Sequence, residues 1–439
     1  MVISDPFVSL KDGTELKPRK NHRIFGVKFR SMVKFLYQLS LFGGVYMSWE
    51  LNSRRNSHDY NYQRIIEFIF NHRQTSRSKI ASALTLNKAT VSLLCSEMQE
   101  QGLISEVGSG SAQSKGGRKP TLIEINKAYG YTLTIELDAQ HIRALACYLD
   151  GETITFQQLT VANITSLSTA LNDLISQFAA LPNTNQGLLG ICFAIHGIVN
   201  QNRVESSFLD LQDVDLVQLG AKYQVPVSLE NEANLAAIYS RDFIPGNKLD
   251  NTVTLSIHEG IAAGLILDQR LYLGSQGRVG RIGQNIVVPA FPINNSRSMV
   301  TYQDVYSEDA ITKQISELLA KPGLSLDDIS KLYDDHNGEV ITILSQFANG
   351  VSEILHNIAG LIDPDMFYIN SPLLHQFPGL LAQIRKYFYR SSGYEIPTTL
   401  MPNVQLATLL GGAALTTHRY LHLEGVRLRF SDYINPALI

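Results

Sequence analysis

A repeated pattern of strands and helices constrains the fold of this sequence more than any other feature. The segment YTLTIELDAQHIRALACYLDGETI at 131–154 reads as two strands with a turn at Asp150-Gly151, and NTVTLSIHEGIAAGLILDQRLYLG at 251–274 has the same layout of strand, turn and strand. Helical segments and further buried strands follow each pair. Two such units predict an α/β body made of two lobes with a cleft between them.

A different pattern precedes this body. The segments YNYQRIIEFIFNH, TSRSKIASALTL and NKATVSLLCSEMQEQGLI each place apolar residues at helical spacing, with Thr75 or Ser76 as an N-cap and Gly102 as a stop signal. A strand, a loop rich in glycine and serine, and a second strand follow in LISEVGSGSAQSKGGRKPTLIEI. Three helices and a hairpin in this order predict a winged helix-turn-helix domain at 58–126.

The bulk composition is that of a soluble globular protein. The chain has 439 residues, of which 44% are hydrophobic and 18% charged, and this suits two or three domains. The three cysteines lie too far apart for a clustered zinc site or a dense disulfide framework, which favours a reducing cytoplasm. The apolar run from Phe35 to Met47 is too short to span a bilayer, so we expect no membrane partner.

The charge is divided unevenly along the chain. Residues 1–125 carry 18 Lys and Arg against 10 Asp and Glu, whereas the remainder carries 19 against 30. A basic N-terminal part ahead of an acidic body favours a polyanionic partner, here double-stranded operator DNA. Residues 1–57 read as a basic extension, either a flexible arm or the product of a translation start assigned too far upstream.

Nine residues are candidates for contact with DNA. The N-terminal part of the third helix would face base edges in the major groove, and the start of the second helix would lie near a phosphate. The cationic loop KGGRKP suits a narrow minor groove. The candidates are Ser76, Arg77, Asn87, Lys88, Thr90, Ser92, Lys115, Arg118 and Lys119.

Three motifs of the body resemble those of the ROK family (repressors, open reading frames, kinases), in its repressor branch. LENEANLAAI at 229–238 resembles the family's E-N-D-A-N-x-A-A stretch. GICFAIHGIV at 190–199 resembles G-I-G-x-P-G-I-V, with His196 in place of the proline, and GRVGRIGQ at 277–284 resembles G-x-x-G-E-I-G-H.

The resemblance covers residues 60–425 and implies a winged helix-turn-helix ahead of a two-lobed actin/hexokinase-like, RNase H-like α/β body. We expect lobe I at 127–231, joined by the C-terminal helix near 405–425, and lobe II at 232–404.

Phosphoryl transfer requires a carboxylate base and a backbone cradle for the ATP phosphates. The sequence differs from the kinases of this family at both. The base position holds Glu232, longer by one methylene than the family's aspartate. The D-x-G-G-T-like phosphate turn reads ELDAQHIRA, without the glycines and with Asp138, and the glycine pair used near the adenosine falls on INSPLL at 369–374. We therefore expect no enzymatic activity and no cofactor.

The family's structural zinc site is also missing from the sequence. Its histidine position holds Gln284, and no cysteine follows in the segment where the family has a cluster. Amide side chains are poor ligands for Zn²⁺, so we expect no metal. We interpret His258 and Glu259 as turn residues rather than a metal pair or an acid–base dyad, because adjacent strand residues point to opposite faces.

The candidate ligand site differs from the family's sugar-binding pattern in charge. The positions that grip sugar hydroxyls read Asn231, Glu232, Arg281 and Gln303, with His196 and Gln284 beside them. Because Arg281 stands where the family has a glutamate, three hypotheses remain open: a pocket for an anionic sugar derivative, a closed pocket with an internal pair between Arg281 and Glu232, or a neutral sugar bound differently.

The sequence as a whole predicts a DNA-binding transcriptional regulator, a repressor of carbohydrate-related genes that binds a palindromic operator as a homodimer. The alternatives are a ligand-independent DNA-binding scaffold and a sugar kinase with an appended regulatory domain.

Overall fold

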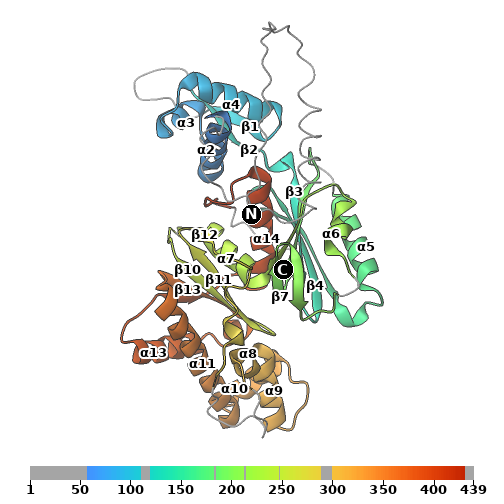
Figure 1. Ribbon diagram of the computed structural model, residues 1–439, viewed down its shortest axis with the longest axis vertical. Coiled ribbons are helices and arrows are strands. Elements are labelled where there is room, and N and C mark those ends of the chain that lie inside the picture. Colours follow the sequence, from blue (N-terminus) through green and yellow to red (C-terminus); the bar gives the residue numbers. More distant parts are fainter. Residues whose placement is uncertain are drawn as a thin grey trace, which may run out of the picture. The chain divides into compact units, whose positions relative to one another are not determined.

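The structure is a computed structural model that describes residues 57–109, 119–181, 184–211, 214–246, 248–287 and 299–430 (Figure 1). All of these residues belong to one structural unit. The expected extension at 1–57, apart from its last residue, and the wing residues Lys115 and Arg118 lie outside the described residues.

Three helices and a β-hairpin form the N-terminal part of the described chain, which we call the head (residues 57–126). The elements are α2 (Ser57–His72), α3 (Arg77–Ala83), α4 (Lys88–Glu100), β1 (Ile104–Ser109) and β2 (Thr121–Ile125). Side chains of Ser76 and Asn87 cap α3 and α4 by accepting hydrogen bonds from backbone N–H groups of the first turn. Apolar residues at helical spacing, such as Ile65, Ile80 and Leu94, are buried in a common core.

The first sheet has the strand order β5-β4-β3-β6-β9 and belongs to what we call the first lobe. Its strands are β3 (Tyr131–Leu137), β4 (His141–Tyr148), β5 (Thr153–Thr160), β6 (Leu188–Ile195) and β9 (Val227–Asn231). The pairs β3–β4 and β4–β5 are antiparallel, and β3–β6 and β6–β9 are parallel. Every residue of β3 is buried, as expected for a strand covered on both faces.

Helices and a small hairpin complete the first lobe. Leucine, isoleucine and phenylalanine side chains of α5 pack with residues of β3 and β6 in one core. The remaining elements are α5 (Leu167–Ala179), α6 (Leu216–Ala221), β7 (Gly197–Asn200) and β8 (Arg203–Ser207).

The second sheet, with the order β12-β11-β10-β13-β14, belongs to the second lobe. Its strands are β10 (Thr252–Ile257), β11 (Ile261–Leu267), β12 (Arg270–Leu271), β13 (Met366–Asn370) and β14 (Thr398–Leu400). Its helices are α8 (Tyr302–Tyr306), α9 (Glu308–Leu318), α10 (Leu326–Asp334), α11 (Gly338–Ile362), α12 (Pro372–Gln376) and α13 (Leu380–Ser392). The 25-residue α11 buries one apolar face in the same core as the strands.

Two helices, α7 (Glu232–Asp242) and α14 (Ala407–Leu421), pack against each other and against strands of both sheets (Figure 1). All 11 residues of α7 are buried. Two glycines allow this close packing. A Cβ atom on Gly411 of α14 would lie 1.9 Å from the Leu235 carbonyl oxygen, and one on Gly264 of β11 would lie 2.2 Å from that of Ala233. The backbone of α7 is therefore wedged between α14 and β11.

The segment that follows α14, which we call the C-terminal strap (residues 422–430), returns to the head. The Asn71 side chain on α2 donates to the carbonyl of Arg427 (3.0 Å) and accepts from the N–H of Arg429 (2.8 Å). The ring of Phe70 meets that of Phe430 edge to face, with centroids 5.0 Å apart. The strap thus joins the first helix of the head to the last helix of the body.

Candidate ligand-binding site

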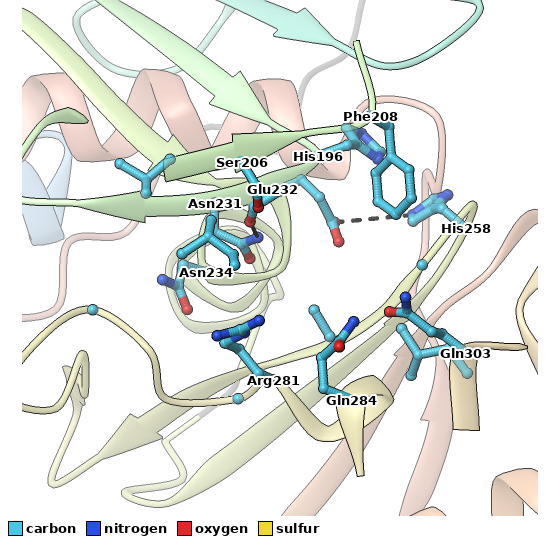
Figure 2. A pocket seen from close by; sticks show the side chains of 18 of the residues that line it. His196, Ser206, Phe208, Asn231, Glu232, Asn234, His258, Arg281, Gln284 and Gln303 are labelled. Carbon is cyan, nitrogen blue, oxygen red and sulfur yellow. Dashed lines mark hydrogen bonds and ion pairs between the residues drawn. The ribbon is translucent and has the colours of Figure 1, made fainter. Parts of the chain in front are cut away.

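A cavity of about 330 Å³ opens between the two lobes. The first lobe contributes the β7–β8 hairpin and the junction of β9 with α7, and the second contributes the β10–β11 turn and the segment at 277–284 (Figure 2). Its volume lies at the small end of ligand pockets, which run from about 300 to 1,000 Å³. The polar side chains that line it are His196, Ser206, Asn231, Glu232, Asn234, His258, Arg281, Gln284 and Gln303. All six ligand-site residues predicted from the sequence are among them.

Asn231 and Glu232 reach the cavity because β9 ends and α7 begins there. The Asn231 amide oxygen caps α7 by accepting from Ala233 N–H (2.9 Å), and its Nδ2 donates to the Gly197 carbonyl (2.7 Å). An amide has two N–H donors and two lone pairs, so one of each remains for a ligand. Asn231 therefore fixes the backbone of the site while keeping a free donor and acceptor.

The Glu232 carboxylate is buried on the other side of the same junction. It accepts from the Ser256 hydroxyl (2.9 Å) and lies 4.0 Å from Nε2 of His258. Burial raises the pKa of Glu232 to about 7, although the charge of His196 opposes the shift. The group therefore changes its protonation state near neutral pH.

Arg281 lies on the opposite wall and is exposed, with its guanidinium directed into the cavity (Figure 2). Among the described residues its side chain has no hydrogen-bond or ion-pair partner. The structure therefore shows no internal ion pair between Arg281 and Glu232. Glu232 faces the second sheet and bonds to Ser256 instead.

Two glycines of GRVGRIGQ are required by the packing of this loop against β11. A Cβ on Gly280, whose φ is +80°, would lie 1.7 Å from the Ala263 carbonyl oxygen, and one on Gly283 would lie 2.3 Å from that of Ile261. The loop can therefore lie directly on β11. This close approach places Arg281 and Gln284 on the cavity wall.

His196 lines the cavity, but both of its ring nitrogens are already engaged. Its Nε2 lies 2.9 Å from Glu136 and its Nδ1 lies 3.1 Å from Glu259, while Arg143 approaches Glu136 from the other side (3.4 Å). Burial alone would lower the pKa of His196, but hydrogen bonds to the two carboxylates outweigh it and raise the pKa well above its usual value. His196 is thus a charged structural centre with no ring nitrogen left for a ligand.

The residues around His196 were largely missed by the sequence analysis. His258 and Glu259 do lie in the turn between β10 and β11, but both also belong to this buried cluster. Burial and the charge of His196 lower the pKa of His258 to about 3. The partners come from distant parts of the chain, and no local motif marks them.

The turn between β3 and β4, where the sequence lacks the glycines of a phosphate cradle, is satisfied internally. The Asp138 carboxylate accepts from the N–H groups of Gln140 (2.8 Å) and His141 (2.5 Å) and from Arg143 (2.8 Å). The backbone donors of this turn are therefore occupied by a carboxylate of the chain itself.

The described residues that were predicted to contact DNA include two helix caps, one hydrogen-bonded arginine and four exposed or half-buried side chains. Ser76 is buried as the cap of α3, Asn87 caps α4, and Arg77 donates to Gln99 (3.1 Å). Lys88 and Lys119 are exposed, and Thr90 and Ser92 are half-buried. The structure also shows an exposed apolar residue on α4, Leu93, which is 66% exposed and was not among the residues predicted from the sequence.

The residues that the structure describes contain no group of three or more His, Cys, Asp or Glu side chains arranged to hold a metal ion. None of their helices combines the length and the apolar character needed to cross a membrane.

Comparison with known proteins places the chain in a family. The model of the ROK family matches residues 132–418. The chain is 37% identical over 384 residues to the xylose repressor of Lactiplantibacillus pentosus, which covers 87% of this chain and 98% of the relative. It is 35% identical over 374 residues to the xylose repressor of Staphylococcus xylosus, covering 84% and 97%.

A solved structure described as a ROK family transcriptional regulator, homolog of the E. coli MLC protein, aligns with a TM-score of 0.64. It is 19% identical and covers 83% of this chain and 99% of that chain, so the likeness concerns the fold. The family match, the relatives and the shared fold lead to one conclusion: the chain belongs to the ROK family, and its α/β body has that family's sugar-kinase-like fold.

Proposed function

We propose that the protein is a sugar-responsive transcriptional repressor whose head binds operator DNA as a winged helix-turn-helix. Two relatives that match over most of the chain are named xylose repressors, which supports a pentose as the effector. The same names support a regulator rather than a kinase, and the occupied turn at Asp138 agrees with this. A repressor acts where the chromosome is, so the proposal implies a cytoplasmic protein.

The observation that carries the proposal is the course of α7. This helix begins at Glu232 in the cavity and ends at Asp242, and every residue between them is buried. A helix wedged by Gly264 and Gly411 moves as one body, because its neighbours lie against its backbone. A shift at the cavity is therefore transmitted to the far end of α7.

The far end of α7 contacts the strap that holds the head. The side-chain carboxylate of Asp242 binds Arg241 (2.7 Å) and His418 of α14 (2.7 Å). The backbone carbonyl of Asp242 accepts a hydrogen bond from the N–H of Phe430 (3.2 Å). The ring of Phe430 lies between Phe243 at the end of α7 and Phe70 of the head, with centroids 5.0 Å from each. A continuous set of contacts thus runs from the sugar cavity to α2.

The head suits the major groove through the start of α4. Lys88 is exposed in the first turn, and α4 has no acidic residue there, which favours contact with a phosphate. The Ser76 and Asn87 caps satisfy backbone N–H groups in the first turns of the two helices of the motif and so stabilise their N-terminal ends. A palindromic operator would pair two such heads in a homodimer.

The effector is proposed to be a neutral pentose that bridges the two walls of the cavity. Asn231 and Glu232 offer acceptors and one donor from the first lobe, while Arg281, Gln284 and Gln303 offer donors from the second. Binding to both walls would fix the lobe angle and so the position of α7. The guanidinium of Arg281, which forms no ion pair within the described part of the chain, favours a second candidate, an anionic sugar derivative.

Fluorescence anisotropy tests the proposal. A labelled duplex from the DNA upstream of the protein's own gene is titrated at fixed salt, alone and with D-xylose, L-arabinose, D-glucose or a pentose phosphate. We expect tight binding that D-xylose weakens. Release by the pentose phosphate alone would favour the anionic effector, and the absence of specific DNA binding would overturn the proposal.

A second measurement tests the DNA-binding surface itself. Lys88→Ala should reduce the magnitude of the negative slope of log K for DNA association against log salt concentration by about one, since one phosphate contact is lost. Lys313→Ala is the matched control, because Lys313 is an exposed lysine of α9 in the second lobe. Equal slopes for the two variants would argue against DNA contact through α4.

A further inference from the structure

Phe208 is an aromatic side chain in the cavity that makes no ring contact with another aromatic residue in the part of the chain that the structure describes. It follows β8, lines the cavity and is 48% exposed (Figure 2). Among the described residues it is the only phenylalanine, tyrosine or tryptophan in the cavity lining. An exposed ring of this size loses contact with water when a ligand covers it, which favours binding.

The ring is held in place from both lobes. The backbone N–H of Phe208 donates to the carbonyl of His196 (3.0 Å), so the charged cluster around His196 anchors its backbone. Across the cleft, a Cβ on Gly260 would lie 3.0 Å from Cζ of the ring. The β10–β11 turn thus leaves just enough space for the ring, because residue 260 has no side chain.

The aromatic ring of Phe208 and three of the polar side chains lie on opposite sides of the cavity. Phe208 lies beside His258 on one side, while Arg281, Gln284 and Gln303 lie across the cavity (Figure 2). A pyranose has the same division, because its hydroxyl groups project from the edge of the ring and its C–H groups cover the faces. Hydrogen bonds at the edge and an aromatic ring on a face would satisfy both kinds of surface.

We propose that Phe208 is a specificity-determining residue that packs against the C–H face of a pyranose effector. The inference rests on the proposed function and narrows it. The site prefers sugars with a face free of axial hydroxyl groups, such as β-D-xylopyranose, over pyranoses that turn an axial hydroxyl toward the ring. A hydroxyl pressed against an aromatic face loses its hydrogen bonds to water without replacement.

Isothermal titration of the full chain without DNA tests the affinity. We expect Phe208→Ala to weaken D-xylose binding by about tenfold, the scale of a lost aromatic contact, and to narrow the preference for D-xylose over L-arabinose. Gly260→Ala should also weaken binding, because its Cβ would press on the ring. Tyr272→Ala is the matched control, since Tyr272 is 50% exposed outside the cavity lining.

A fluorescence measurement distinguishes direct contact of residue 208 with the sugar from a role of Phe208 in holding the segment after β8 in place. The natural chain has one tryptophan, Trp49, so Phe208→Trp adds a single reporter in the cavity. We expect D-xylose to change the fluorescence of Phe208→Trp but not that of the wild-type protein, and to bind Phe208→Trp more weakly than the wild-type protein, because the larger indole has little space beside Gly260.

The outcomes distinguish the inference from the function beneath it. If D-xylose releases the wild-type protein from DNA and Phe208→Ala responds at the same concentration, the role of Phe208 is wrong and the repressor stands. If no sugar binds the wild-type protein, the inference fails together with the sugar part of the proposed function. A silent Phe208→Trp that still binds D-xylose would also overturn the packing contact.

Discussion

At the scale of single residues, the pKa of Glu232 leads us to expect that the proposed sugar binding depends on pH. Burial raises its pKa from 4.5 in the unfolded chain to about 7, so ionisation opposes folding as pH rises through this window. A sugar hydroxyl that donates to the carboxylate favours the ionised form, and a bond to a charged acceptor is the stronger. We therefore expect affinity for D-xylose to rise about fivefold between about pH 6 and about pH 8.

Calorimetry of the wild-type protein and Glu232→Gln across this range provides the check. Three neighbours do not titrate in the window, because the pKa of His258 is lowered to about 3, that of Glu259 is lowered to about 2, and that of His196 is raised well above its usual value. Glu308, whose N–H donates to the His258 carbonyl, does titrate there, because burial raises its pKa to about 7. A pH dependence that persists in Glu232→Gln would assign the effect to another group.

His196 lines the cavity, but we expect its main role to be the stabilisation of the fold. His196→Ala leaves Glu136 and Glu259 buried without their shared partner, and breaking such a buried pair costs about 3–5 kcal/mol. Urea unfolding measures the loss. His141→Ala is the control, because His141 is partly exposed and lies 3.7 Å from Asp138, a pair worth at most about 1 kcal/mol. Similar losses for both would mean that the cluster is not stabilised through His196.

At the scale of elements, the packing of α7 depends on glycine where it meets α14. A methyl group on Gly411 would overlap the Leu235 carbonyl, so Gly411→Ala should force the helices apart and destabilise the fold by about 1–3 kcal/mol or more. Gly360→Ala on α11 has open space around it and should be neutral or stabilise by up to about 1 kcal/mol. Thermal unfolding compares the two. Equal melting temperatures would show that α7 and α14 tolerate a wider spacing.

The sequence predicted elements better than it predicted contacts. Regular spacing of apolar residues predicted the helices of the head and the paired strands, because local pattern and burial agree there. The all-round burial of α7 had no local signal, since LENEANLAAI reads as a helix of mixed polarity. The six ligand-site residues followed from motifs, whereas the tertiary fold alone brings Phe208 into the cavity and Glu136 against His196.

At the scale of the whole molecule, the strap offers a place where sensing and DNA binding can be separated. Phe430 is 4% exposed and lies between the end of α7 and the head. Coupling of two sites by about 1–3 kcal/mol corresponds to about 5–150-fold in affinity, and it requires an element that both sites bias. Removing the ring leaves both binding surfaces intact but opens a space between α7 and α2.

We therefore expect Phe430→Ala to bind D-xylose with unchanged affinity and to bind operator DNA, while the sugar no longer weakens that binding. The ratio of DNA dissociation constants with and without D-xylose measures the coupling. Phe388→Ala is the matched control, because Phe388 is also 4% exposed but lies in the core of the second lobe. Loss of coupling in Phe430→Ala alone assigns signal transmission to the strap. The same ratio in Phe430→Ala and the wild-type protein would mean that the signal reaches the head by another route.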